Sequence, residues 1–94
     1  MHYRIISEPH PADGSITLLL NGKFSEDAIP ELAQFLSTAK VGHDRVFLDL
    51  SEVTLVDRRA VRYFSEQASA DVKLVNCPTY LRRWITRVSD ENES

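Results

Sequence analysis

The sequence predicts a single small α/β domain in which helices pack on a mixed, mainly parallel four-stranded sheet, in the order β-β-α-β-α-β-α. Its 94 residues suffice for one hydrophobic core but not for two. The hydrophobic fraction of 43% and the charged fraction of 27% are those of an ordinary globular protein. Segments with alternating apolar residues are followed by segments in which apolar residues recur every three or four positions, which is typical of βαβ units.

The first two predicted strands form a hairpin at one end of the sheet. Residues 3–7 predict a short strand, and residues 9–14, with two prolines and an Asp-Gly pair, predict a loop. In residues 15–23 large aliphatic side chains alternate, which predicts a second strand that Asn21 and Gly22 end. Because the connecting loop is short, we expect the two strands to pair antiparallel.

A helix is predicted over residues 26–40, since five apolar residues recur there with helical spacing. Ser25 is the candidate N-cap, and Pro30 lies early in the helix, where its missing N–H is tolerated. Gly42 is expected to end this helix. The apolar positions are Ile29, Leu32, Phe35, Leu36 and Ala39.

The second half of the chain repeats the alternation of strand and helix. Residues 45–50 are the most apolar stretch and predict a central strand, and residues 58–69 predict a helix. Residues 71–76 predict the last strand, and residues 78–88 a third helix. The domain is expected to span residues 1–88, followed by a disordered acidic tail at 89–94. The inward side chains predicted for the second helix are Val61, Phe64 and Ala68.

Charge is distributed unevenly along the chain. The net charge is −3, but residues 57–88 hold seven bases against three acids, whereas the remainder holds four bases against eleven acids. The acidic total argues against nucleic-acid binding, and no apolar run approaches the ~20 residues that span a membrane. A single cysteine excludes an internal disulfide and fits the cytoplasm.

Three stretches of the sequence resemble the STAS domain, a family named for sulphate transporters and anti-sigma-factor antagonists. They are LNGKFSEDAIPEL (20–32), RVFLDLSEVTLVDRRAVRYF (45–64) and KLVNCPTYLRRWI (73–85). The family's pattern has a glycine after the second strand, here Gly22, and a strand reading V-x-L-D-L-S-x-V, here residues 46–53. The resemblance covers about residues 16–88 and implies the family's mixed sheet. In the family's bacterial regulators, an Asp precedes a Ser, and a partner kinase phosphorylates that Ser to release the module from its complex.

This sequence departs from the family's pattern at the phosphorylation site. Asp57 matches the Asp, but Arg58 stands in place of the Ser and Arg59 in place of the following hydroxyl residue. Ala60 replaces a glycine, and Ser25 replaces an Asp that the family often carries. Because arginine has no hydroxyl group and keeps its positive charge, the sequence predicts no phosphorylation at position 58.

The two arginines at the start of the second helix call for an explanation. Helix N-termini favour negative charge, so each exposed arginine there costs about 0.3–1 kcal/mol. One hypothesis is a permanent docking patch for an acidic protein surface, with Asp57 as the N-cap of the helix. Solvated arginines left after the loss of a switch explain the sequence equally well. The residues predicted to bind a partner are Asp57, Arg58, Arg59, Arg62, Thr54 and Ser25.

The resemblance implies a non-enzymatic module that binds a serine kinase or anti-sigma factor. One alternative is an accessory subunit that docks on the ATPase of an ABC-type membrane transporter, and another is a sensor that binds an anion or nucleotide phosphate at Arg58 and Arg59. A homodimer is left open. Ser51 and Thr54 are the other hydroxyl groups near position 58. The transporter surface would consist of Tyr80, Trp84 and the arginines 82, 83 and 87.

The sequence offers little that would support catalysis, and no cofactor or metal is predicted. His2, His10 and His43 lack metal-ligand spacing with Cys, Asp or Glu. Three glycines cannot form a phosphate-binding loop. Cys77 is the one candidate nucleophile, because a helix start can lower a thiol pKa, but a free cysteine is more often a small buried hydrophobic residue.

Overall fold

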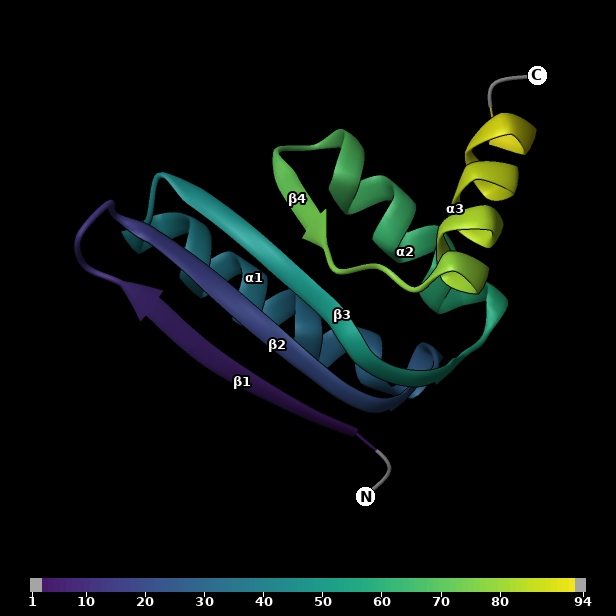
Figure 1. The fold of residues 1–94 in the computed structure, drawn as a ribbon, viewed down its shortest axis with the longest axis horizontal. Helices are drawn as coiled ribbons and strands as arrows, with labels where there is room; N and C mark the ends of the chain where they lie inside the picture. Colours follow the sequence, from purple (N-terminus) through teal and green to yellow (C-terminus); the bar gives the residue numbers. More distant parts are fainter. Residues whose placement is uncertain (1–2, 93–94) are drawn as a thin grey trace.

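The described residues form four strands, three α-helices and one short 3-10 helix (Figure 1). The computed structural model describes residues 3–92, without the side chains of residues 69 and 89–92. The strands lie in one sheet in the order β1-β2-β3-β4. The elements are β1 (Tyr3–His10), β2 (Ser15–Phe24), η1 (Glu26–Ala28), α1 (Ile29–Gly42), β3 (Arg45–Val56), α2 (Arg58–Ser69), β4 (Val72–Val75) and α3 (Thr79–Asn92).

The predicted mixed topology of the sheet is confirmed. β1 and β2 pair antiparallel, whereas β2 with β3 and β3 with β4 pair parallel. Helix α1 connects β2 to β3, and α2 connects β3 to β4. Because such crossovers are right-handed and both move the same way across the sheet, α1 and α2 cover the same face. Helix α3 packs against α2, and β1 forms the opposite edge of the molecule (Figure 1).

The core lies between the helices and one face of the sheet. Along β2 and β3 the side chains alternate between buried and half-buried: Leu18 and Leu48 are buried, whereas Leu19 and Asp49 are partly exposed on the other face. This alternation is expected of a sheet with one covered face. The helices contribute to the core Leu32, Leu36 and Ala39 of α1, Val61 and Phe64 of α2, and Leu81 and Val88 of α3.

Three strands are longer than the sequence predicted. β1 continues to His10 because Pro9 lies on an edge strand, where a missing N–H is tolerated. β2 continues beyond Asn21 and Gly22 through a bulge, at which Gly22 adopts φ +94°, a conformation that favours glycine. β3 continues from residue 50 to Val56, because its second half pairs with the end of β2.

The helices also differ in detail from the prediction. Ala68 was expected to point inward but is exposed, whereas Ser65, one turn earlier in α2, is buried. Helix α3 continues to Asn92, so residues 89–92 are helical rather than part of a disordered tail. No glycine or proline follows Val88 that would end the helix there. The remaining tail residues, 93–94, lie outside the described part of the chain, as does His2.

Candidate functional site

Asp57 connects the two segments in which a strand is followed by a helix, β2 to η1 and β3 to α2. It follows β3 directly and is the N-cap of α2, as predicted, with its Oδ1 accepting a hydrogen bond from the Ala60 N–H at 2.9 Å. Its other oxygen, Oδ2, accepts from the Glu26 N–H at 3.0 Å, at the start of η1. Its own N–H donates to the Phe24 carbonyl at 3.2 Å. The carboxylate of Asp57 thus bonds two helix starts, and its backbone N–H bonds the end of β2.

The three arginines of the predicted patch all lie at this corner and are all exposed. Arg59 forms an ion pair with Glu26, with its Nε 3.2 Å from a carboxylate oxygen, and its side chain remains 77% exposed. Arg58, Arg59 and Arg62 line an open hollow of about 430 Å³ between the start of α1 and one face of α2. The guanidinium groups are thus presented to solvent and are not buried in the core.

The two remaining residues of the predicted patch lie nearby. Ser25 occupies the position before η1, as predicted, but its hydroxyl group makes no capping hydrogen bond. The Asp57 carboxylate takes over that function for the Glu26 N–H. Thr54 lies beyond the strand predicted for residues 45–50 but is an exposed residue of β3. Ser25 and Thr54 therefore contribute surface at the corner rather than fix its backbone.

Ser51, the other hydroxyl considered near position 58, belongs to a separate group of residues. Its N–H donates to Asp49 Oδ1 at 2.9 Å, and the Asn76 amide donates to Asp49 Oδ2 at 3.1 Å. Burial alone would raise the pKa of Asp49, but the hydrogen bonds from Ser51 and Asn76 outweigh it and hold that pKa below its usual range. Asn76 reaches this position because it adopts φ +52°, which asparagine tolerates well.

Several residues at this corner are not among those predicted to bind a partner. Leu55 of β3 is 53% exposed and lies two positions before Asp57. Ile29, Tyr63 and Glu66 line the hollow together with the arginines. Leu55 lies beyond the strand predicted for residues 45–50, so its exposure on β3 was not predicted. Glu66 could be placed beside Arg62 from the helical spacing of four residues.

The surface considered for a transporter partner is only partly available. The Tyr80 hydroxyl group donates to the Val53 carbonyl at 3.1 Å, which ties α3 to β3, and the side chain remains 48% exposed. Trp84 is half-buried and packs against the core. The arginines at 82, 83 and 87 are exposed along α3. Aromatic packing thus accounts for Trp84, whereas the cations of α3 form a second exposed basic surface.

Cys77, the candidate nucleophile, is a free and partly buried cysteine. Burial raises the pKa of the Cys77 thiol, and Arg82 offsets this only in part, so the thiol is not activated. In the described part of the chain, no three His, Cys, Asp or Glu side chains are close enough to hold a metal ion. Within residues 3–92, no helix has the length and apolar character needed to cross a membrane.

Comparisons with known proteins agree on the fold. No family model matches the chain, and no curated protein matches it in sequence. The structure is similar to the STAS domain of an anti-sigma-factor antagonist from Rhodobacter sphaeroides, with a TM-score of 0.60 and 17% identity over 80% of this chain and 87% of that chain. It is also similar to an uncharacterized protein of the DUF3478 family with a SpoIIAA-like fold from Shewanella loihica, with a TM-score of 0.59 and 18% identity over 98% of this chain and 80% of that chain. The chain therefore has a STAS-like fold, as the sequence predicted.

Proposed function

Starting from this STAS-like fold, we propose that the chain is a non-enzymatic module that binds another protein through the surface around Asp57. In this proposal it acts in the cytoplasm and resembles an anti-sigma-factor antagonist, and its partner is a serine kinase or an anti-sigma factor with an acidic contact surface. The observation that carries the proposal is the gathering of Arg58, Arg59 and Arg62, all exposed, around one open hollow.

The physical argument rests on where these charges lie. Two arginines in the first turn of α2 oppose the helix dipole, so helix stability does not explain them. Arginine is enriched at protein interfaces, and complementary charge speeds association and selects the partner. Leu55, two residues before Asp57 in the sequence, is exposed and offers an apolar side chain that a partner can bury. Together these features favour an acidic protein surface over solvent as the neighbour of the arginines.

Binding of this kind would be permanent rather than switched at position 58. Phosphorylation of a serine would place about −1.5 to −2 charges at the helix start. Arg58 holds a positive charge there at all physiological pH values. Occupancy of the module would therefore follow the concentrations of the chain and its partner, unless another hydroxyl such as that of Thr54 is modified.

The test begins with the whole chain as bait in its native host. The captured protein is identified by mass spectrometry, purified, and titrated with the chain by isothermal calorimetry. We expect the double variant R58S/R59S to weaken binding by about 10–100-fold, as loss of central interface arginines does. The matched control R82S/R83S removes the same charge from α3 and is expected to bind like the wild type.

Each other outcome counts against the proposal. Unchanged affinity of R58S/R59S would leave the arginines as solvated surface residues. Weakening only by R82S/R83S, with an ATPase of a membrane transporter as the captured protein, would favour the transporter alternative and its α3 surface. A thermal shift of the wild-type chain with nucleotides, lost in R58S/R59S and without any protein partner, would favour the anion sensor.

A second experiment addresses the missing phosphorylation site. If the partner is a serine kinase, incubation with ATP and magnesium is expected to leave residue 58 of the wild-type chain unmodified. The single variant R58S supplies a hydroxyl group at the family's position and is expected to become phosphorylated and to dissociate from the kinase. Mass spectrometry reads out the modification. An R58S variant that binds the kinase but accepts no phosphate would contradict this part of the proposal.

A further inference from the structure

The outer edge of β1 is unpaired by any described residue and is long enough to accept another strand. β1 has eight residues, Tyr3–His10, and the strand order leaves it at the edge of the sheet (Figure 1). An exposed edge with free N–H and C=O groups is a template for pairing with another chain. The features of β1 decide which strand it would accept.

The backbone of β1 presents its outward groups at odd-numbered residues. The His10 carbonyl accepts from the Gly14 N–H at 3.0 Å, so it points toward β2. Because backbone groups alternate along a strand, the even-numbered residues face β2 and Tyr3, Ile5, Ser7 and Pro9 face outward. The missing N–H of Pro9 is therefore on the outer side, where it leaves the β1–β2 pairing intact.

The side chains of β1 are self-complementary in one register. In an antiparallel pair of two β1 strands centred on Ile6, Arg4 of one copy lies opposite Glu8 of the other, and Ile6 lies opposite Ile6. Both charges are exposed, and Ile6 is one of the exposed large hydrophobic residues, at 39%. All three lie on the sheet face that no described helix covers, because they pair with Asn21, Leu19 and Thr17 of β2. We propose that this chain forms a symmetric homodimer by antiparallel pairing of its β1 strands.

The backbone supports the same register. With Ile6 at the centre, Ile5 lies opposite Ser7, and both are outward residues that can exchange N–H and C=O bonds. Tyr3 lies opposite Pro9, so its outward N–H meets the Pro9 carbonyl and not the missing N–H. The neighbouring even registers, shifted by two residues, place Arg4 opposite Ile6 or His10 and lose the charge pair. Of these three registers, only the one centred on Ile6 places Arg4 opposite Glu8 and also gives the outward N–H groups of Tyr3, Ile5 and Ser7 a carbonyl partner.

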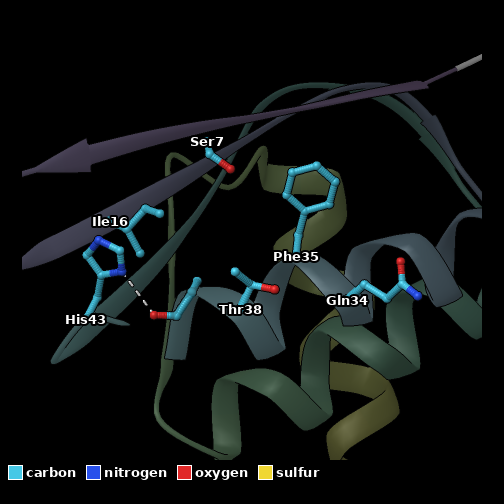
Figure 2. Close-up of a pocket in the computed structure, with 7 residues that line it drawn as sticks. Ser7, Ile16, Gln34, Phe35, Thr38 and His43 are labelled. Atoms are coloured by element: carbon cyan, nitrogen blue, oxygen red, sulfur yellow. Dashed lines mark hydrogen bonds between the residues drawn. The ribbon is translucent and has the colours of Figure 1, made fainter. Parts of the chain in front are cut away.

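An apolar hollow beneath β1 adds surface to this contact (Figure 2). It has a volume of about 320 Å³ and lies between Ser7 of β1 and Phe35, Thr38 and Ala39 of α1. The small side chain of Ser7 leaves the space beneath the strand unfilled. In the proposed dimer, Ile5 of the second copy lies opposite Ser7 on the same face of the sheet. Its side chain would thus cover the mouth of the hollow and bury apolar surface there.

Sedimentation equilibrium of the whole chain tests the dimer, at concentrations up to about 1 mM. The wild type is expected to show a reversible monomer–dimer equilibrium. The single variants E8K and R4E each place like charges opposite each other twice, so each is expected to lower the association constant by about tenfold or more. The charge-swapped double variant R4E/E8K restores opposite pairs and is expected to dimerise like the wild type.

Two further variants separate this edge from other contacts. E52K makes the same charge change as E8K on an exposed residue of β3 and is expected to dimerise normally. Ser7→Pro removes an outward N–H without touching the β1–β2 pairing and is expected to abolish the dimer, with circular dichroism and thermal unfolding confirming the fold. A monomeric wild type, unaffected single variants or an unrestored double variant would each overturn the proposal. R58S/R59S is expected to remain dimeric, so failure here is distinguishable from failure of the proposed function.

Discussion

The two helix entrances that meet at Asp57 carry opposite charges. The entrance to α1 contains Glu26 and Asp27 in η1 and Glu31 in the first turn of α1. The entrance to α2 has no acid in its first turn and begins with Arg58 and Arg59. Negative charge at a helix start complements the dipole, and positive charge opposes it. The α1 entrance thus follows the rule of helix stability, whereas the α2 entrance breaks it.

The shared carboxylate explains how α2 tolerates this charge. Asp57 gives one oxygen to each entrance, so α2 has a side-chain cap even though its first turn is basic. Glu26 of the α1 entrance also pairs with Arg59 of the α2 entrance. The negative charge of Glu26 at the α1 entrance therefore offsets part of the positive charge at the α2 entrance. A helix can thus carry unfavourable charge at its start when a neighbouring helix start supplies the counter-charge.

The largest effect is expected from Asp57→Ala, which removes the cap of α2 and the acceptor for the Glu26 N–H together. We expect the free energy of unfolding to fall by about 2 kcal/mol, since a lost N-cap alone costs about 0.5–2 kcal/mol. Chemical denaturation monitored by circular dichroism measures this. Ser25→Ala is the matched control, and its hydroxyl makes no capping bond, so a change below about 0.5 kcal/mol is expected. If Asp57→Ala lowered the free energy of unfolding no more than Ser25→Ala does, the conclusion that one carboxylate stabilises both helix starts would be wrong.

A smaller effect on stability is expected from R58S/R59S. Removing each cation removes an unfavourable interaction with the helix dipole and is expected to stabilise the fold by about 0.3–1 kcal/mol. The change also removes the exposed Arg59–Glu26 pair, which is worth at most about 1 kcal/mol. The free energy of unfolding is therefore expected to stay about the same or to rise by up to about 2 kcal/mol, whereas partner affinity falls. If the unfolding free energy dropped by more than that of R82S/R83S, the arginines would be structural residues and the contrast between the entrances would lose its functional meaning.

The order of elements could be predicted from the sequence because it depends on local patterns. The alternation around Leu18 and the helical spacing around Leu32 each reflect which face of one element is buried. The extension of β3 could not be predicted in the same way. Residues 51–56 contain three exposed residues besides Ser51 and follow no clean alternation, and their strand conformation depends on pairing with Lys23 and Phe24 of β2. The strand conformation of residues 51–56 thus results from pairing with β2 and not from their own sequence pattern.

The candidate site shows the same division between local and distant causes. The cap of α2 by Asp57 was predictable, because an Asp directly before a helix start is a local signal. The second bond of Asp57, to the Glu26 N–H, joins residues 31 positions apart in the sequence and has no local signal. The hollow likewise brings Ile29 of α1 to the arginines of α2. Residue types could be predicted from the sequence, but their assembly into one surface could not.

The smallest expected effect concerns the pKa values of two tyrosines, Tyr3 near the α1 entrance and Tyr63 of α2. Tyr3 donates its hydroxyl hydrogen to Glu31 Oε1 at 2.9 Å, and this hydrogen bond, then burial and the charges of Glu31 and Asp27, raise the pKa of Tyr3 above its usual value. Burial first, and then Glu66, raise the pKa of Tyr63 beside the α2 arginines. Of these two tyrosines, only Tyr3 has its pKa raised by acids of the α1 entrance.

Glu31→Gln is therefore expected to lower the pKa of Tyr3 toward its ordinary value of about 10 and to leave Tyr63 unchanged. The sign follows because loss of the Glu31 charge removes repulsion of the tyrosinate that forms at high pH, and loss of the carboxylate acceptor weakens the bond that favours the protonated form. Ultraviolet absorbance of the tyrosinate against pH measures the change, and Tyr3→Phe identifies the Tyr3 component of the curve. Identical titration curves for the wild type and Glu31→Gln would show that the acidic charge of the α1 entrance does not reach the edge strand, and the difference between the two entrances would then be confined to α2.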